Sequence, residues 1–127
     1  MYRLVEPQEL RNNWQFVKHG LERILLKSPE YWIPEDIYAS LANNKSTLWL
    51  WIEDDKPVGF VVGYVVGENF HIWCAYGILH SVKQAFAELE NIVRGQCKRI
   101  TFESWRSGWT KTAKQLGFSP RGWVKEL

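Results

Sequence analysis

The fold is decided by residues 70–118, FHIWCAYGILHSVKQAFAELENIVRGQCKRITFESWRSGWTKTAKQLGF. Residues 70–76 form an apolar run that predicts a buried strand, and a helix follows it with an inner face of Val82, Phe86, Leu89, Ile92 and Val93. Residues 99–104 predict another strand, and a last helix ends at Leu116-Gly117-Phe118, where glycine ends the helix and Phe118 folds back as a cap. Because a helix joins the two strands, we expect them to lie parallel in a right-handed crossover.

Upstream of this stretch, the sequence predicts two helices and an antiparallel meander. Residues 10–27 carry apolar side chains at helical spacing and stop before Pro29, while Pro34 begins a second helix that runs to about residue 42. Residues 47–52 and 58–66 are strands that pair with residues 70–76, residues 2–5 form a short strand, and residues 122–127 can form a final one. Residues 58–66 lack polar alternation, which indicates burial on both faces.

The predicted architecture is a single α+β domain, α/β/α-like in its layers, over residues 1–127. Its central sheet is mixed and mainly antiparallel, with one parallel crossover, and about four helices flank it. A chain of 127 residues with 46% hydrophobic and 24% charged residues has the composition of a globular protein, which excludes disordered and fibrous classes.

Composition also limits location and partners. No apolar run approaches the roughly 18 residues that cross a bilayer, and the first ten residues lack the pattern of a secretory signal, so we expect a cytosolic protein without a membrane partner. In that setting Cys74 and Cys97 are expected to be free thiols.

Charge is distributed unevenly along the chain. Residues 1–93 hold 8 basic and 12 acidic side chains, whereas residues 94–127 hold 8 basic and 2 acidic ones. The basic end could bind nucleic acid, the phosphates of a nucleotide cofactor or an acidic protein surface, because charge selects a sign and not a partner. It is equally consistent with a face that only contacts solvent.

This order of elements resembles the GCN5-related N-acetyltransferase (GNAT) fold over nearly the whole chain. In that family a Gln/Arg-x-x-Gly-x-Gly/Ala loop between strand and helix wraps the pyrophosphate of acetyl-CoA. The corresponding corner here is Tyr76-Gly77-Ile78-Leu79-His80-Ser81, so the resemblance implies that Tyr76, Gly77, Ile78 and Ser81 bind the cofactor.

The corner lacks the glycines that let main-chain N–H groups approach phosphate at a helix N-terminus. Ile78 and Leu79 place branched carbons there, only Gly77 offers close approach, and Ser81 is expected to cap the helix with its hydroxyl within the capping box Ser81-Val82-Lys83-Gln84. The sequence therefore predicts that no cofactor is bound, with acetyl-CoA as the cofactor if the chain is active.

The catalytic positions of the family also differ. Counted back from Leu116-Gly117-Phe118, the tyrosine that often acts as general acid is Ala113, and the usual asparagine is Arg106. Glu103 remains as a candidate general base if it faces the cleft with a raised pKa, and a solvent-facing charge if it does not.

Short motifs suggest a narrower resemblance, to the small acetyltransferase-like proteins encoded by tailed bacteriophages. The motifs are Pro34-Glu35-Asp36-Ile37-Tyr38, Leu48-Trp49, Gly95-x-Cys97 and Arg106-x-Gly108-Trp109. Relatives of those proteins accompany head and tail genes or are packaged in the virion. The resemblance implies a phage structural protein or a host protein as partner, and a location in the host cytoplasm or the virion.

Other chemistry has weaker signals. A zinc site would need His71, Cys74, His80 and Cys97 to converge, but residues three apart on a strand point to opposite faces, so no metal is expected. Trp105, Arg106, Trp109, Arg121 and Trp123 interleave rings and cations. These residues suit an interaction surface for protein or single-stranded nucleic acid. Alternatively, the indole rings cover the core while the lysines face water.

Three hypotheses follow, and the sequence leaves open whether the chain is an enzyme. The first is a phage-encoded acetyltransferase-like protein with a degenerate acyl-CoA motif, acting through protein contacts in the virion, in assembly or on the host. The second is an active acetyl-CoA-dependent N-acetyltransferase, which requires an open cleft between the strands at 70–76 and 99–104, unblocked by Ile78 or Trp105. The third is nucleic-acid binding through the basic C-terminal region.

Overall fold

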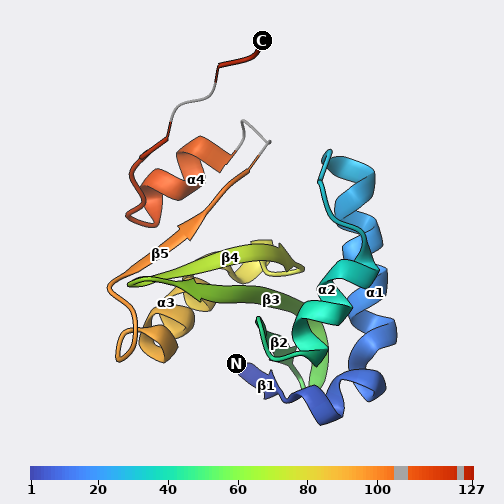
Figure 1. Cartoon of the computed structure of the whole chain (residues 1–127). Helices are drawn as coiled ribbons and strands as arrows, with labels where there is room; N and C mark the ends of the chain where they lie inside the picture. The colour runs from blue at the N-terminus through green and yellow to red at the C-terminus, as the bar shows by residue number, and fades with distance from the viewer. Residues whose placement is uncertain (105–108, 123–124) are drawn as a thin grey trace.

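The computed structural model describes residues 1–104, 109–122 and 125–127. In these ranges the chain forms one five-stranded sheet in the order β1-β2-β3-β4-β5 (Figure 1). The strands are β1 (Tyr2–Val5), β2 (Thr47–Glu53), β3 (Lys56–Val66), β4 (Asn69–Tyr76) and β5 (Arg99–Phe102). The first four pair antiparallel, and β4 and β5 are parallel, which confirms the mixed sheet with a parallel crossover.

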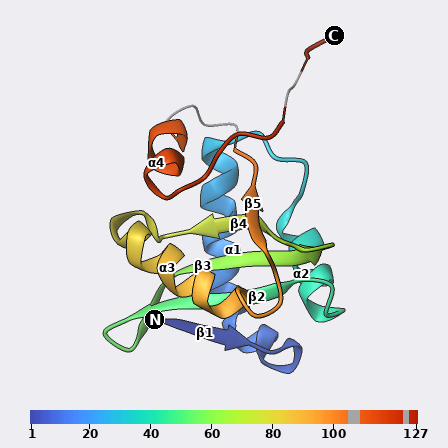
Figure 2. The same ribbon diagram turned by 90° about the vertical axis from the view of Figure 1, so that its left-hand side faces the viewer.

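Helices cover both faces of this sheet (Figure 2). α1 (Leu10–Lys27) and α2 (Pro34–Ala42) lie on one face, and α3 (Val82–Val93) lies on the other. α4 (Trp109–Gln115) packs beyond β5, and two short 3-10 turns, η1 (Pro7–Glu9) and η2 (Leu79–Ser81), precede α1 and α3. α2 begins as the sequence predicts, with Pro34 in its first turn and the Asp36 carboxylate accepting the Ile33 N–H at 3.0 Å.

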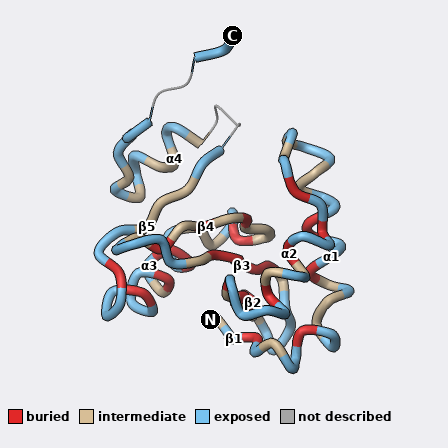
Figure 3. The backbone as a smooth tube through the Cα atoms, viewed as in Figure 1, coloured by how far each residue is buried: buried red, intermediate tan, exposed pale blue. Residues whose placement is uncertain are grey.

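Two hydrophobic cores result, one on each side of the sheet. Phe60 and Val62 of β3 join the core beneath α1 and α2, whereas Val61 joins the core beneath α3. Figure 3 shows the buried backbone along β3 and the inner sides of α1 and α3. Residues 59–63 of β3 are therefore buried on both faces, as predicted, whereas Val65 and Val66 at the end of the predicted run are exposed.

The end of α4 confirms the predicted cap. Gly117 has a φ of +90°, and the Phe118 N–H donates to the Ala113 carbonyl at 2.9 Å. This turn folds the Phe118 ring back, with its centroid 4.9 Å from that of Phe102 and 5.6 Å from that of Phe86. The cap fixes α4 against the α3-side core.

The predicted final strand at residues 122–127 is wrong for the part that the structure describes. Residues 122 and 125–127 are not in a strand, and residues 123 and 124 lie outside the described ranges. The described tail extends away from the sheet, where it has no strand to pair with (Figure 1). No helix within the described ranges is long and apolar enough to cross a membrane.

Candidate active site

A cleft of about 340 Å³ opens between β4 and β5. Its walls come from the second half of β4, the corner at residues 77–80, the end of β5, the first residue of α4, and the C-terminal turns of α1 with the segment that follows. We call this cavity the β4–β5 cleft. A cavity between these strands agrees with the second hypothesis for the described residues. Trp105, one of the two proposed plugs, lies outside the described residues.

A β-bulge at Trp73 explains why the cleft is open. Val62 pairs with Cys74 while Gly63 pairs with Ile72, so Trp73 is an extra residue on β4. A bulge bends and twists its strand, and the pairing of β4 with β5 ends one residue earlier, at Ile72 and Phe102. Beyond that point β4 has no β5 partner along its outer edge.

The predicted cofactor corner forms one end of the cleft. Tyr76, Gly77 and Ile78 line it. Ile78 is only 3% exposed and packs in the core beneath α3, so its side chain forms part of the wall and does not plug the cleft. Leu79, by contrast, is 60% exposed beside it.

The expected role of Gly77 as a site of close approach is not what the structure shows. Its φ is +73°, and a Cβ built on it would meet the Val58 carbonyl oxygen and lie 2.9 Å from the Gly59 Cα. The main chain of β3 already fills the space that the missing side chain leaves. Gly77 therefore allows the corner to pack against β3, and that packing accounts for the glycine.

Ser81 does not cap α3, so the predicted capping box is wrong. Its hydroxyl donates to Glu53 Oε1 at 2.8 Å, and Trp51 Nε1–H donates to the same oxygen at 3.1 Å. His80 Nε2 lies 3.0 Å from Glu53 Oε2. The hydrogen bond from His80, followed by those from Ser81 and Trp51, lowers the pKa of Glu53 to about 2. The corner thus holds a fixed negative charge.

Two carboxylates line the cleft itself. Glu103 follows β5 and is exposed, and Glu30 is half-buried in the segment between α1 and α2. Burial raises the pKa of Glu30, a smaller effect of the Trp32 side chain lowers it, and the charge of Glu103 raises it further. Arg23 and Lys27, one turn apart on α1, contribute cations to the same cavity.

At the level of sequence, no protein-family model and no curated protein matches the chain. The solved structures give a clear result. A predicted acetyltransferase with acetyl-CoA from Clostridium acetobutylicum matches with a TM-score of 0.71 and 16% identity, over 100% of this chain and 94% of that one. A possible acetyltransferase from Clostridium difficile 630 matches with a TM-score of 0.75 and 9% identity, over 100% and 95% of the two chains.

A third structure, a ribosomal-protein-alanine N-acetyltransferase from Brucella melitensis biovar Abortus 2308, has a TM-score of 0.69 and 12% identity, over 100% of this chain and 98% of that one. The fold is GNAT-like. The order of its elements, the parallel pairing of β4 with β5 and the position of the cleft all agree with the resemblance in the sequence.

The two cysteines lie in different cores of this GNAT-like fold. Cys74 packs beneath α1 and α2 and Cys97 beneath α3, and both are free, as expected. Burial raises the pKa of the Cys74 thiol, and the charge of Glu30 adds to the effect. Although Cys74 lines the cleft, its thiol stays protonated and is not an activated nucleophile.

The strand-alternation argument against a metal site needs correction. The bulge at Trp73 interrupts the alternation, so that Trp73 and Cys74 both pack on the α1 side. His71 lies near that face too, with its ring centroid 5.4 Å from that of Tyr64, and its Nδ1 is 2.8 Å from Thr101 Oγ1. Over the described residues, no group of three His, Cys, Asp or Glu side chains is placed to hold a metal ion.

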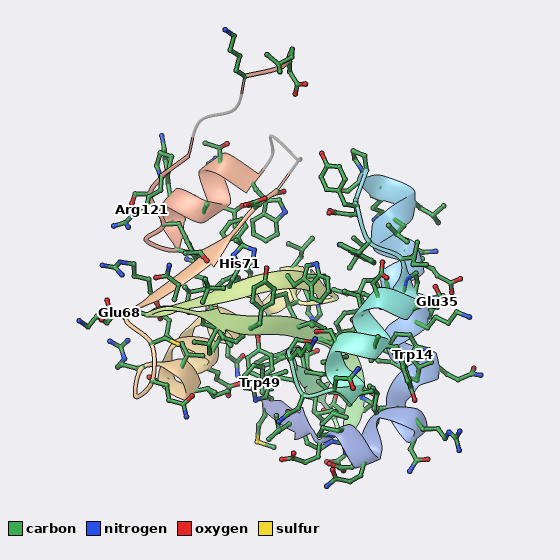
Figure 4. The ribbon with its side chains drawn as sticks, viewed as in Figure 1. Trp14, Glu35, Trp49, Glu68, His71 and Arg121 are labelled. Atoms are coloured by element: carbon green, nitrogen blue, oxygen red, sulfur yellow. The ribbon has the colours of Figure 1, made fainter. Side chains whose placement is uncertain are left out.

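The structure separates the predicted interaction residues. Trp109 lines the cleft with its ring 5.7 Å from that of Phe102, whereas Arg121 lies after α4 and is exposed (Figure 4). Trp105, Arg106 and Trp123 lie outside the described residues. The basic end of the chain is partly neutralised, because Glu68 contacts Lys98 at 3.0 Å and Arg99 at 3.7 Å.

Sequence reasoning missed Glu30 and Glu53. Glu53 stands next to Asp54 and Asp55, and nothing in the sequence separates it from these turn residues. Glu30 follows Pro29 in a connecting segment, where an acidic residue usually faces water. His80 and Ser81 reach Glu53, and Glu103 approaches Glu30, from segments distant in sequence, and these partners could not be seen without the fold.

Proposed function

We propose that the protein transfers an acyl group from a CoA thioester, with acetyl-CoA as the expected donor, to an amine. The observation that carries this proposal is the β4–β5 cleft beside the outer edge of β4, which within the described residues has no strand partner beyond Ile72. An extended, amide-containing arm such as pantetheine can add to a free strand edge through main-chain hydrogen bonds. One of the structures with this fold contains acetyl-CoA, which supports the choice of donor.

The carboxylates of the cleft suit the proton transfer that must precede attack by the amine. An amine acceptor is an ammonium ion at neutral pH and must lose a proton before it attacks the thioester carbonyl. In the proposed reaction Glu30 or Glu103 takes that proton, and the amine nitrogen forms the new C–N bond. The C–S bond then breaks, and a second proton passes from the nitrogen to the CoA thiolate, which leaves as the thiol. Glu30 is the better base, because its raised pKa brings it closer to the working pH.

Calorimetric titration with acetyl-CoA tests donor binding directly. We expect Ala75→Leu, which adds volume inside the cleft, to abolish the binding seen with the unmodified chain. Ala87→Leu makes the same change on the exposed face of α3 and should leave binding intact. Equal binding by both variants, each folded by circular dichroism, would place the donor elsewhere.

Thiol release with a panel of small amines and peptides tests the transfer step. Loss of a general base typically lowers the rate about 10²- to 10⁴-fold. We expect Glu30→Gln to cause such a loss with little change in donor affinity, whereas Glu22→Gln on the exposed side of α1 should have no effect.

The fixed charge of Glu53 favours a second candidate function, in which the protein acts through protein contacts as a phage-encoded virion, assembly or host-interaction protein. A carboxylate at the corner opposes a nucleotide diphosphate there. This candidate predicts no heat on titration with acetyl-CoA and co-purification with phage particles or with one host protein. Tight binding of acetyl-CoA would exclude it.

A further inference from the structure

Glu53 adjoins the cleft through the side chain of His80. His80 lines the cavity, and its Nε2 lies 3.0 Å from Glu53 Oε2. The other carboxylate oxygen accepts from the Ser81 hydroxyl and from the Trp51 indole N–H. Trp51 of β2 and His80 and Ser81 of η2 thus hold one carboxylate at the α3 end of the cleft.

The α3 end of the cleft lies beside a negative charge, whereas the α1 end carries positive charges. Because the hydrogen bonds from His80, Ser81 and Trp51 keep the pKa of Glu53 at about 2, the carboxylate is ionised throughout the neutral range. Apart from His80, which is paired with Glu53 itself, the basic side chains that line the cleft in the described part of the chain are Arg23 and Lys27 of α1, on the other face of the sheet from α3. A phosphate at the corner would meet the anion and not these cations.

The main chain gives a second, independent reason why the corner suits a phosphate poorly. Gly77 is the one glycine among residues 76–81, and it lies directly against Val58 and Gly59. Its small size serves packing between β3 and the corner. It does not open a path for phosphate oxygens to several main-chain N–H groups, which is how a glycine-rich loop binds them.

We propose that Glu53 is a specificity-determining residue that selects the thioester donor by charge. It favours an acyl-pantetheine arm that places no diphosphate at the corner over acetyl-CoA whose diphosphate lies at the corner. The inference rests on the proposed function, since it concerns the donor of that reaction. The donor class it names is an acyl thioester of pantetheine whose phosphate groups are absent or lie outside the cleft.

Three donors and two variants test this selection by calorimetry at low salt. The donors are S-acetylpantetheine, which has no phosphate, acetyl-dephospho-CoA, which keeps the diphosphate but lacks the 3′-phosphate, and acetyl-CoA, which has both. Glu53→Gln removes the charge while its amide oxygen can still accept hydrogen bonds. Asp54→Asn is the matched control, because it removes a charge from the neighbouring exposed residue, and asparagine tolerates its φ of +51°.

We expect the unmodified chain to bind S-acetylpantetheine at least as well as acetyl-CoA. Glu53→Gln should raise the affinity for both diphosphate-containing donors about tenfold and leave S-acetylpantetheine within about twofold, and the gain should shrink as salt is added. Asp54→Asn should change none of the three.

Two results would overturn the inference in distinguishable ways. If the unmodified chain binds acetyl-CoA more than about tenfold tighter than S-acetylpantetheine and Glu53→Gln changes neither, Glu53 does not select the donor, although the proposed function stands. If neither the unmodified chain nor Glu53→Gln binds any of the three donors, the proposed function fails and the inference fails with it.

Discussion

Gly59 and Gly77 lie against each other where β3 meets the corner that follows β4. A Cβ built on Gly59 would stand 2.9 Å from the Gly77 carbonyl carbon, and one built on Gly77 would stand 2.9 Å from the Gly59 Cα. Both contacts are with main chain, which cannot rotate away as a side chain can. This pair therefore fixes the position of the corner, and with it one end of the cleft.

Substitution of either glycine should destabilise the protein. Gly77→Ala combines a clash with a left-handed φ, and we expect the free energy of unfolding to fall by at least about 2 kcal/mol. Gly59→Ala has the clash alone and should cost about 1–3 kcal/mol. Gly95→Ala, where a Cβ meets open space, should change stability by less than about 0.5 kcal/mol. Urea denaturation measures all three, and equal stability of the variants would contradict the packing argument.

Phe118 should control how firmly α4 is held. Its ring contacts Phe86 and Phe102 but is only half-buried, so we expect Phe118→Ala to cost about 2 kcal/mol, less than a fully buried phenylalanine would. Hydrogen exchange should show faster opening of α4 than of α3 in this variant. Lys114→Ala, an exposed change on α4, should leave exchange unaltered. Uniform loss of protection across the chain would show that Phe118 stabilises the whole fold and not α4 in particular.

The Glu53 carboxyl should titrate at about pH 2 when followed by nuclear magnetic resonance. His80→Ala removes the largest cause of the shift, so we expect the pKa to rise toward its ordinary value of 4.5. Because the folded pKa is lowered, the stabilisation from these hydrogen bonds is present above about pH 4.5 and is lost as the pH falls toward 2. A Glu53 resonance that titrates near 4.5 in the unmodified chain would disprove the three-donor arrangement.

Much of the fold was predictable because its elements have local signals. The proline at the start of α2, the helical spacing of α1 and α3, and the Gly117 cap each depend on residues close in sequence. The parallel pairing of β4 and β5 follows from the helix between them.

The parts of the site that depend on distant partners were not predictable. The bulge at Trp73 arises from the register between β3 and β4, and Trp73 itself is as apolar as its neighbours. The same holds for Ser81, which was expected to cap α3 but donates to Glu53, 28 residues away. The sequence placed the candidate corner between a strand and a helix, where the structure has it between β4 and α3, whereas the charge beside it came only from the fold.

Glu30 should make the protein less stable as the pH rises. Burial raises its folded pKa above the ordinary value of 4.5, a smaller effect of the Trp32 side chain lowers it, and the charge of Glu103 raises it further. A carboxyl with a raised folded pKa contributes stability that is fully present below the unfolded value, and this contribution is lost as the pH rises through the folded value. We therefore expect Glu30→Gln to exceed the unmodified chain in stability at pH 7 and to match it at pH 4, measured by urea denaturation. Glu22→Gln, exposed on α1, should show no such difference, and a Glu30→Gln advantage that is the same at both pH values would show that its charge is not the cause.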